Sequence, residues 1–517
     1  MPIKCPTINQ IAYTEPMHKV PVYQTEQIRQ IEEYLFSLNP KPNLMESAGK
    51  TVADLAIQVA PTHARSALVI VGPGNNGGDG YVTARHLKHA NFRVSVLAPL
   101  NKNQSSPDAV SALEKWESAG GAIQSTLSNE DSYDLIIDGL FGIGLKRNLS
   151  SELEELVKHI NRLPATIISI DIPSGLSADT GNVMGCCIRA HHTVTFLGYK
   201  VGLHTGLGPD YSGTIHFSDL NMGPVPPPDN HGYLIGNEVL NNVLTPRAKS
   251  SHKGTHGQLV IIGGSEGLVG AAVLSGRAAI KLGAGRVLMG FVDAASPSID
   301  WMQPEIMMRK ASEVIQLDST TCIAIGPGLG VSNIAYDILT KILALPIPIV
   351  LDADALNLIA QHPALVTLTN NRDNSTVLTP HPGEAARLLD CSVREIQANR
   401  VQATLTLASK FNAEVVLKGV GSVCAFPDGN WFINTTGNPG MASAGMGDVL
   451  TGIIGAFVAQ GAYSHTALLA AVHLQGLAAD QLSNDGCGPI GMTASETIDA
   501  ARIIFNKQRN ANVTPLV

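Results

Sequence analysis

The sequence has few of the features that direct a protein to nucleic acid or to a membrane surface. Only 15% of its 517 residues are charged, and the formal net charge is −8. A chain with this balance has no basic footprint for nucleic acid or for an anionic bilayer. We therefore expect neither as a partner, and any anionic ligand has to bind at local backbone sites.

Cysteine is also scarce and scattered. The seven cysteines are odd in number and form no CxxC pair; they are Cys5, Cys186, Cys187, Cys322, Cys391, Cys424 and Cys487. This pattern disfavours both a disulfide framework and a structural zinc site. The first residues, MPIKCPTINQIAYTEP, lack the apolar core of a signal peptide. We expect a cytoplasmic protein.

Long uninterrupted apolar runs are missing as well. The most apolar stretch, 450–479, is broken by polar residues such as Gln460, His465 and His473. Buried helices fit this pattern better than a membrane span.

Apolar residues and glycine are plentiful: the chain is 44% hydrophobic and has 50 glycines. Such a composition is typical of α/β enzymes with many tight turns, and the length predicts at least two domains. In the first half, 67–71 predicts a buried strand, 72–80 (GPGNNGGDG) a loop, and the following residues a helix. We expect helix throughout 20–60 and a single strand over 193–203.

Acidic residues end two further predicted strands of this half. Asp138 closes DLIID, and in TIISIDIPSG Asp171 ends the apolar strand, before a Pro-Ser-Gly turn. Alternating strands and helices predict a doubly wound parallel sheet, in which ligands bind at the carboxyl ends of the strands. Each acid alone could merely cap a loop, but together with the glycine loop they indicate a site.

The proline-rich stretch 221–232 (NMGPVPPPDNHG) is the best candidate for a linker. The second half repeats the α/β pattern, with strand-end loops in GPGLG, DADALN, LTPHPGE and KGVGS. We predict a first domain over 1–222, a linker over 223–232 and a second domain over 233–517.

Residues 434–450 (NTTGNPGMASAGMGDVL) hold four glycines and one acid, Asp448, before an apolar run that can be helical. A glycine-rich loop entering a helix presents free N–H groups and suits phosphate. Asp448 is then either a helix cap or a base that acts on a hydroxyl during phosphoryl transfer. We expect the helix N-terminus to lower the pKa of Asp448.

Across both halves these motifs resemble the bifunctional enzymes that repair hydrated NADH and NADPH. GPGNNGGDGYVTARHL, DGLFGIGL and DIPSGLSADTG are similar to the epimerase family, and KGTHGQLVIIGGS through NTTGNPGMASAGMGDVLTGIIGA to the dehydratase family. The resemblance implies a Rossmann-like N-terminal domain and a ribokinase-like C-terminal domain. It also implies interconversion of R and S hydrates, followed by dehydration of the S form with ADP converted to AMP and phosphate.

For the epimerase, the resemblance implies potassium as a cofactor and assigns Asp171 to substrate binding and proton handling. The bond changes remain open between ring opening and loss of hydroxide. The other implied substrate contacts are Asn75, Asn76, Gly77, Gly78, Asp79, Gly142, Ile143, Gly144, Leu145, Lys146, Arg147 and Asn148, and the implied potassium ligands are Asn76, Asp138 and Ser174.

For the dehydratase, the resemblance implies that Asp448 is the catalytic base. The implied substrate contacts are Ala271, Gly328, His381 and Asp448, and the nucleotide contacts are Lys418, Gly419, Val420, Gly421, Ser422 and Gly447. His381, between two prolines, is equally compatible with a structural role. We expect Mg²⁺ because the ADP phosphates need charge neutralisation.

Two rival hypotheses remain at this point. A ribokinase-type small-molecule kinase with an accessory domain shares the GMGD turn, and a binding protein without activity shares the first domain. Neither accounts for the intact acids and loops of both halves. We also expect a homo-oligomer.

Overall fold

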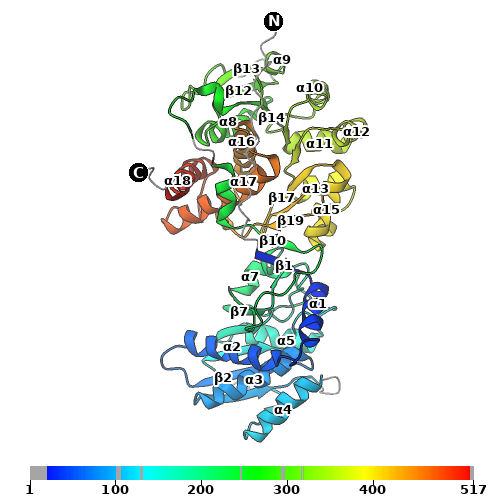
Figure 1. Ribbon diagram of the computed structural model, residues 1–517, viewed down its shortest axis with the longest axis vertical. Coiled ribbons are helices and arrows are strands. Elements are labelled where there is room, and N and C mark those ends of the chain that lie inside the picture. The colour runs from blue at the N-terminus through cyan, green and yellow to red at the C-terminus, as the bar shows by residue number, and fades with distance from the viewer. Residues whose placement is uncertain are drawn as a thin grey trace.

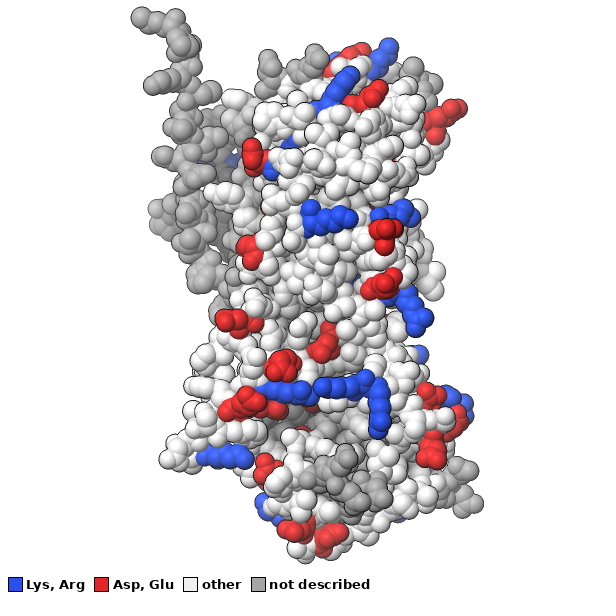
Figure 2. All heavy atoms as spheres, turned by 90° about the vertical axis from the view of Figure 1, so that its right-hand side faces the viewer, with Lys and Arg blue, Asp and Glu red and all other residues white. Residues whose placement is uncertain are grey.

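The computed structural model describes residues 20–100, 106–127, 132–244, 247–292, 297–315, 317 and 319–512, with the backbone alone for 509–512. Two α/β bodies stack along the long axis, the N-terminal half below and the C-terminal half above (Figure 1). On the face shown in Figure 2, lysine and arginine lie interspersed with acidic residues over the described part of the surface.

The first body contains a seven-stranded sheet that is parallel throughout, in the order β4-β3-β2-β5-β6-β7-β9. The first strand of this sheet along the chain is β2, which lies in its middle, and the direction of winding reverses between β2 and β5. The strands are β2 (Ser66–Val71), β3 (Arg93–Leu97), β4 (Ile123–Gln124), β5 (Leu135–Gly139), β6 (Thr166–Ile170), β7 (His192–Phe196) and β9 (Thr214–Ser218). This order confirms the predicted Rossmann-like doubly wound sheet.

Alternate residues of these strands bury themselves under helices on opposite faces. Val69 and Val71 pack on one face, and Leu68 and Ile70 on the other. Because both faces are covered, the strands read as continuous apolar runs. The first face is covered by α1 (Thr25–Phe36), α2 (Leu44–Val59), α3 (Asn75–His89) and α4 (Pro107–Ser118), and the second by α5 (Ser151–Ile160).

The second body contains most of a twelve-stranded sheet, in the order β13-β12-β11-β14-β15-β16-β17-β18-β19-β10-β1-β8. The strands from β13 to β17 are parallel, and β17, β18 and β19 form an antiparallel meander. The strands are β13 (Met307–Lys310), β12 (Arg286–Phe291), β11 (Gln258–Gly263), β14 (Cys322–Ile325), β15 (Ile349–Leu351), β16 (Thr376–Leu378), β17 (Glu414–Leu417), β18 (Val423–Ala425), β19 (Trp431–Ile433), β10 (Gly232–Leu234), β1 (Val20–Tyr23) and β8 (Tyr199–Lys200).

Two hydrophobic cores flank this sheet. One face packs against α8 (Val269–Lys281), α16 (Met446–Ala459), α17 (Ser464–Asn484) and α18 (Ala494–Asn512). The other packs against α9 (Ala311–Val314), α10 (Asn333–Leu343), α11 (Ala353–Gln361), α12 (Pro363–Asn370), α13 (Pro382–Leu389), α14 (Val393–Ala398) and α15 (Arg400–Phe411). Three short 3₁₀ helices of the described chain are η1 (Asn237–Val243), η2 (Lys253–His256) and η3 (Pro439–Met441).

The two bodies are joined through this sheet. β10, just after the proline-rich stretch, pairs with β19 on one side and with β1 on the other, and β8 extends β1. Strands from both sides of the predicted linker therefore share one hydrogen-bonded ladder. The domain boundaries at 222 and 233 stay a prediction.

Three local predictions were wrong. Residues 20–23 form β1 rather than helix, because their backbone pairs with β10 from far along the chain. Residues 193–203 are not one strand: they contain β7 from its second residue on, the short β8 and the start of helix α6 (Val201–His204). Helix α3 begins at Asn75, inside the predicted glycine loop, because Gly77 and Gly78 pack tightly in its first turn.

The apolar stretch 450–479 forms most of two buried helices, α16 and α17, joined by a turn at 460–463, so the predicted buried helices are confirmed. Among the described residues, no helix is both long and apolar enough to cross a membrane.

Helix α16 packs closely on α8, and glycine makes this possible. A Cβ at Gly452 would lie 2.2 Å from the backbone oxygen of Ser275, whereas one at Gly270 would meet nothing within 4 Å. We expect Gly452→Ala to destabilise the fold by about 1–3 kcal/mol through overpacking. Gly270→Ala, the matched control in α8, should be neutral or stabilise by up to about 1 kcal/mol. Thermal unfolding of the two variants checks this, and equal midpoints would contradict the packing.

Two candidate active sites

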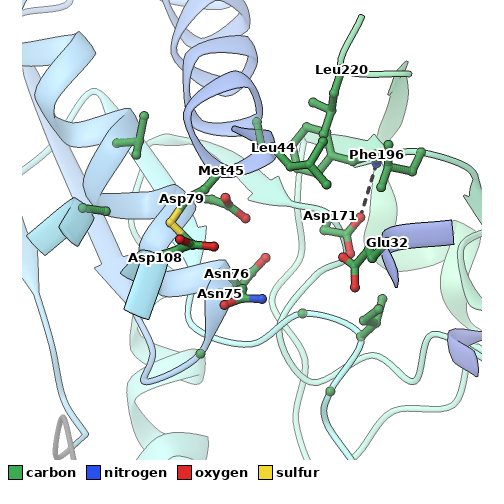
Figure 3. Close-up of a pocket in the computed structure, with 18 of the residues that line it drawn as sticks. Glu32, Leu44, Met45, Asn75, Asn76, Asp79, Asp108, Asp171, Phe196 and Leu220 are labelled. Carbon is green, nitrogen blue, oxygen red and sulfur yellow. Dashed lines mark hydrogen bonds between the residues drawn. The ribbon is translucent and has the colours of Figure 1, made fainter. Parts of the chain in front are cut away.

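A pocket of about 590 Å³ opens at the carboxyl edge of the first sheet, where the winding reverses between β2 and β5. In Figure 3, Asp171 and Glu32 lie together on one side, and Asn75, Asn76 and Asp79 lie across from them. The polar residues reach the pocket from the start of α3, from the loop after β6 and from α1.

Most of the predicted epimerase substrate residues line this pocket. They are Asn75, Asn76, Asp79, Gly142, Ile143, Gly144, Leu145 and Asp171. Gly77 and Gly78 do not line it: a Cβ at Gly77 would lie 1.9 Å from the oxygen of Gly72, so this glycine allows the loop to fold back on itself. Lys146, Arg147 and Asn148 are exposed and outside the pocket lining.

Asp171 forms an ion pair with a lysine that the sequence analysis missed. The Nζ of Lys200 donates to Oδ1 of Asp171 and, at 2.7 Å, to the carbonyl oxygen of Phe196. Lys200 is only 1% exposed, and Asp171 is held in the left-handed region at φ 63°. The signal available in the sequence was one charged residue within the otherwise uncharged stretch TVTFLGYKVGL.

Two further carboxyls surround this pair. Burial, with the nearby charge of Asp171, raises the pKa of Glu32 and raises that of Asp79 well above its usual range. Both groups therefore hold a proton more readily than an exposed carboxyl does. Glu32 comes from α1, a region to which the sequence analysis gave no functional role.

The predicted potassium ligands meet beside this pocket. Asp138 is fully buried and accepts hydrogen bonds from Ser169 Oγ at 2.8 Å and from the backbone and hydroxyl of Ser174 at 2.8 and 2.5 Å. Burial raises the pKa of Asp138, although these hydrogen bonds oppose the shift. Asn76 is also buried, and its Nδ2 has no hydrogen-bond partner.

These residues fit a monovalent cation. Among the described residues, Asp138 has no ion-pair partner, and a buried carboxylate needs a compensating charge or a proton. Carboxylate, hydroxyl and amide oxygens are hard ligands of the kind that such a cation prefers. The assignment of potassium to Asn76, Asp138 and Ser174 stays a prediction.

The second site lies at the carboxyl edge of the other sheet, where α16 begins. Gly445 caps this helix at φ 90°, and Asp448 follows in the first turn, as predicted. The backbone oxygen of Asp448 accepts a hydrogen bond of 2.7 Å from Ser275 Oγ of α8. This contact fixes the start of α16 against α8, which also carries the predicted substrate contact Ala271.

An ion pair again lies next to the candidate base. Lys418 Nζ is 2.9 Å from Oδ1 of Asp352, which is 1% exposed. Asp352 also accepts hydrogen bonds from Thr379 and Thr451, at 2.7 and 2.8 Å. A Cβ on Gly447 would lie 3.0 Å from Lys418 Nζ, so a bulkier residue there would crowd the lysine.

Lys418 and Gly447 could be predicted from the sequence, but Asp352 was missed: the motif DADALN, which contains it, indicated only a strand-end loop. Burial lowers the pKa of Lys418, but the negative charges of Asp352 and Glu384 outweigh this effect, so the pKa of Lys418 is raised overall. The lysine therefore stays protonated near neutral pH.

The expected lowering of the Asp448 pKa was wrong. Burial, reinforced by the charge of Asp352, raises the pKa of Asp448 to about 7, even though Lys418 opposes the shift. A carboxyl with this pKa is a far better base near neutral pH than an ordinary aspartate.

The remaining predicted contacts lie on several elements of the second body. Gly328 lies in the turn after β14, and residues 418–422 form the turn between β17 and β18, as predicted. His381 caps α13: its Nδ1 accepts from the backbone N–H of Gly383 at 2.9 Å, and burial lowers its pKa. This contact shows a structural role for His381, and its predicted contact with substrate stays a prediction.

Both halves match known proteins. A family model described as YjeF-related protein N-terminus matches residues 41–202, and one described as NAD(P)H-hydrate dehydratase matches residues 259–502. The Bifunctional NAD(P)H-hydrate repair enzyme Nnr of Escherichia coli (strain K12) is 39% identical over 479 residues, covering 90% of each chain. The chain belongs to this family of bifunctional NAD(P)H-hydrate repair enzymes.

The Vibrio cholerae (serotype O1, strain ATCC 39315 / El Tor Inaba N16961) member of this repair family is 38% identical over 495 residues, covering 94% of this chain and 98% of its own. A solved ADP/ATP-dependent NAD(P)H-hydrate dehydratase from Bacillus subtilis, co-crystallised with ATP/Mg²⁺, is 30% identical, covering 53% of this chain and 98% of its own, with a TM-score of 0.46. The second half has the predicted α/β fold. Because the chain belongs to the repair family, its family is neither that of a ribokinase-type small-molecule kinase nor that of an inactive binding protein, the two rival hypotheses.

The buried pair between Lys200 and Asp171 gives a stability prediction for this member of the repair family. Lys200→Met leaves Asp171 without its partner, so we expect a loss of about 3–5 kcal/mol in the free energy of unfolding. Lys158→Met, which removes an exposed pair with Glu155, should change stability little. Thermal unfolding of both variants is the measurement, and a Lys200→Met protein as stable as Lys158→Met would contradict the buried pair.

Proposed function

We propose that the chain repairs hydrated NADH and NADPH in two separate sites. The first interconverts the R and S hydrates, and the second dehydrates the S hydrate to NAD(P)H while ADP is converted to AMP and phosphate. The observation that carries the proposal is Asp448, a carboxyl with a pKa of about 7 beside the Lys418–Asp352 pair at the end of a glycine-rich loop.

In the dehydratase site, the chemistry starts at the hydroxyl of the hydrate. Asp448 takes the proton from this hydroxyl while the hydroxyl oxygen bonds to the β-phosphoryl group of ADP, and AMP leaves. Hydroxide is a poor leaving group, whereas the phosphorylated oxygen departs readily as the lone pair of the ring nitrogen expels it. Loss of a proton from the neighbouring carbon then restores the ring double bond.

The nucleotide is held by the turn between β17 and β18. The backbone of residues 418–422 follows the phosphates, and Lys418 supplies a positive charge fixed by Asp352. Mg²⁺ neutralises the phosphates when it is bound. The described residues contain no cluster of three acids, histidines or cysteines able to hold a metal ion, so the phosphates would provide most of its ligands.

In the epimerase site, Asp171 is the residue that exchanges a proton with the substrate, and Lys200 orients the carboxylate of Asp171. Glu32 and Asp79, whose pKa values are raised, hold protons within the same pocket and are suited to protonate a departing hydroxyl. This arrangement serves ring opening and hydroxide loss equally well. A potassium ion held by Asn76, Asp138 and Ser174 would supply charge compensation for the buried Asp138. The cytoplasmic location and the homo-oligomer also stay predictions.

If the two reactions take place in separate sites, a substitution in one site should abolish one activity and leave the other. Asp448→Asn keeps the shape of the side chain but removes the base, so dehydration should fall by at least about 100-fold while epimerisation persists. Asp171→Asn should abolish epimerisation and leave the dehydration of purified S hydrate intact. Recovery of reduced-nicotinamide absorbance from purified S hydrate with ADP measures dehydration, and the ratio of R to S hydrate, followed by chromatography without ADP, measures epimerisation.

Asp499→Asn, an exposed acid on α18, serves as the control and should behave as the unaltered protein. Loss of both activities in a folded Asp448→Asn protein would refute separate sites. No recovery from either epimer by the unaltered protein would refute the repair function.

The raised pKa of Asp448 predicts the pH dependence of the dehydratase. The base acts only when ionised, so kcat/KM should fall below pH 7 by about tenfold per pH unit, reaching about 1% of the plateau at pH 5. An aspartate with the usual pKa of about 3.9 would leave the rate nearly flat over this range. Initial rates from pH 5 to 9, with folding checked at pH 5, make the comparison, and a flat profile would contradict the assignment.

A further inference from the structure

A residue of the first half reaches the nucleotide turn of the second. We propose that Thr205 positions residues 418–422 and so sets the affinity of the dehydratase site for ADP. This inference rests on the proposed function of that turn. It makes the epimerase half a structural part of the dehydratase site.

The hydroxyl of Thr205 makes hydrogen bonds in both directions across the junction. Its Oγ1 accepts from Arg400 Nε at 3.1 Å and donates to the carbonyl oxygen of Gly421, also at 3.1 Å. Thr205 is 1% exposed, so water does not replace these partners. Removing the hydroxyl of Thr205 would leave the carbonyl oxygen of Gly421 without its hydrogen-bond donor.

The backbone of the nucleotide turn lies directly against the same segment. Gly421 has φ 59°, and a Cβ there would lie 1.9 Å from the backbone oxygen of His204 and 2.7 Å from the Cα of Thr205. No side chain fits between the two halves at this point. A shift of residues 204–205 must therefore move the turn.

Arg400 connects the Thr205 hydroxyl to the first residues of the turn. It is 2% exposed, and its Nη2 donates to the carbonyl oxygens of Leu417 and Lys418, at 3.1 and 3.3 Å. Its guanidinium has no carboxylate partner among the described residues. Three partners orient this buried group: Thr205 at Nε, the turn at Nη2, and Gln397, whose Oε1 accepts from Nη1 at 2.8 Å.

The contact also continues into the epimerase pocket. Thr205 directly follows α6, and α6 directly follows Lys200, the partner of Asp171. One short segment thus touches both sites. By linkage, a nucleotide that orders the turn has to stabilise the segment as well.

A second bond across the junction provides a matched control. Asn182 Nδ2 donates to the carbonyl oxygen of Ala398 at 2.9 Å, and within the described part of the chain Asn182 makes no hydrogen bond to the nucleotide turn. If the junction served only to hold the halves together, losing either bond would have similar consequences.

The test compares Thr205→Val, Thr205→Ser and Asn182→Ala in the full chain by the KM for ADP and the kcat of S-hydrate dehydration. Valine keeps the shape of threonine without its hydroxyl, so Thr205→Val should raise the KM about tenfold and change kcat less than twofold. Thr205→Ser and Asn182→Ala should stay within twofold of the unaltered protein. An unchanged KM in Thr205→Val, or an equal rise in Asn182→Ala, would overturn the inference.

Hydrogen exchange of the unaltered protein provides an independent measurement if Thr205→Val fails to fold. Saturating ADP should slow exchange at residues 201–205, and unchanged exchange there would also overturn the inference. An unaltered protein without ADP-dependent dehydration would refute the proposed function instead, since the nucleotide turn would then have no role to test.

Discussion

Parallel strands bring their carboxyl ends to one edge of a sheet, and both candidate sites depend on this constraint. Strands bury their apolar residues under helices on both faces, so the strand ends are where polar groups can collect. Asp138 and Asp171 meet at such an edge in the first sheet, and Asp352 and Asp448 in the second. The loops that follow supply backbone N–H groups and close approach, which a chain of net charge −8 needs in order to bind anionic cofactors.

Burying acids at these edges has a cost, and the protein meets it in different ways. Asp171 and Asp352 each pair with a lysine, so their charge is balanced within the site. Asp138 is satisfied by hydrogen bonds and by the proposed cation. Among the described residues, the carboxylate of Asp448 has no hydrogen-bond or ion-pair partner, and burial raises its pKa instead. The raised pKa suits Asp448 to accept a proton near neutral pH.

Much of this could be predicted from the sequence, because strands and glycine loops leave local patterns. Lys200, Glu32 and Asp352 were missed because their importance comes from partners 29 to 139 residues away. Strand β1 was missed for the same reason, since its partner is β10.

The pKa error for Asp448 has a different origin. A helix dipole contributes about 0.3–1 kcal/mol, which is less than one pKa unit, whereas burial shifts a carboxyl by up to about 3–5 units. The sequence shows the helix start but not the burial, so the weaker effect was given too much weight.

The central claim is that the second site phosphorylates the hydroxyl of the hydrate in order to remove it. The fate of that oxygen tests this directly. When S hydrate carrying ¹⁸O in its hydroxyl is dehydrated with ADP, the mechanism predicts one ¹⁸O atom in the inorganic phosphate, detected by mass spectrometry. Recovery of the label in water, with unlabelled phosphate, would contradict it.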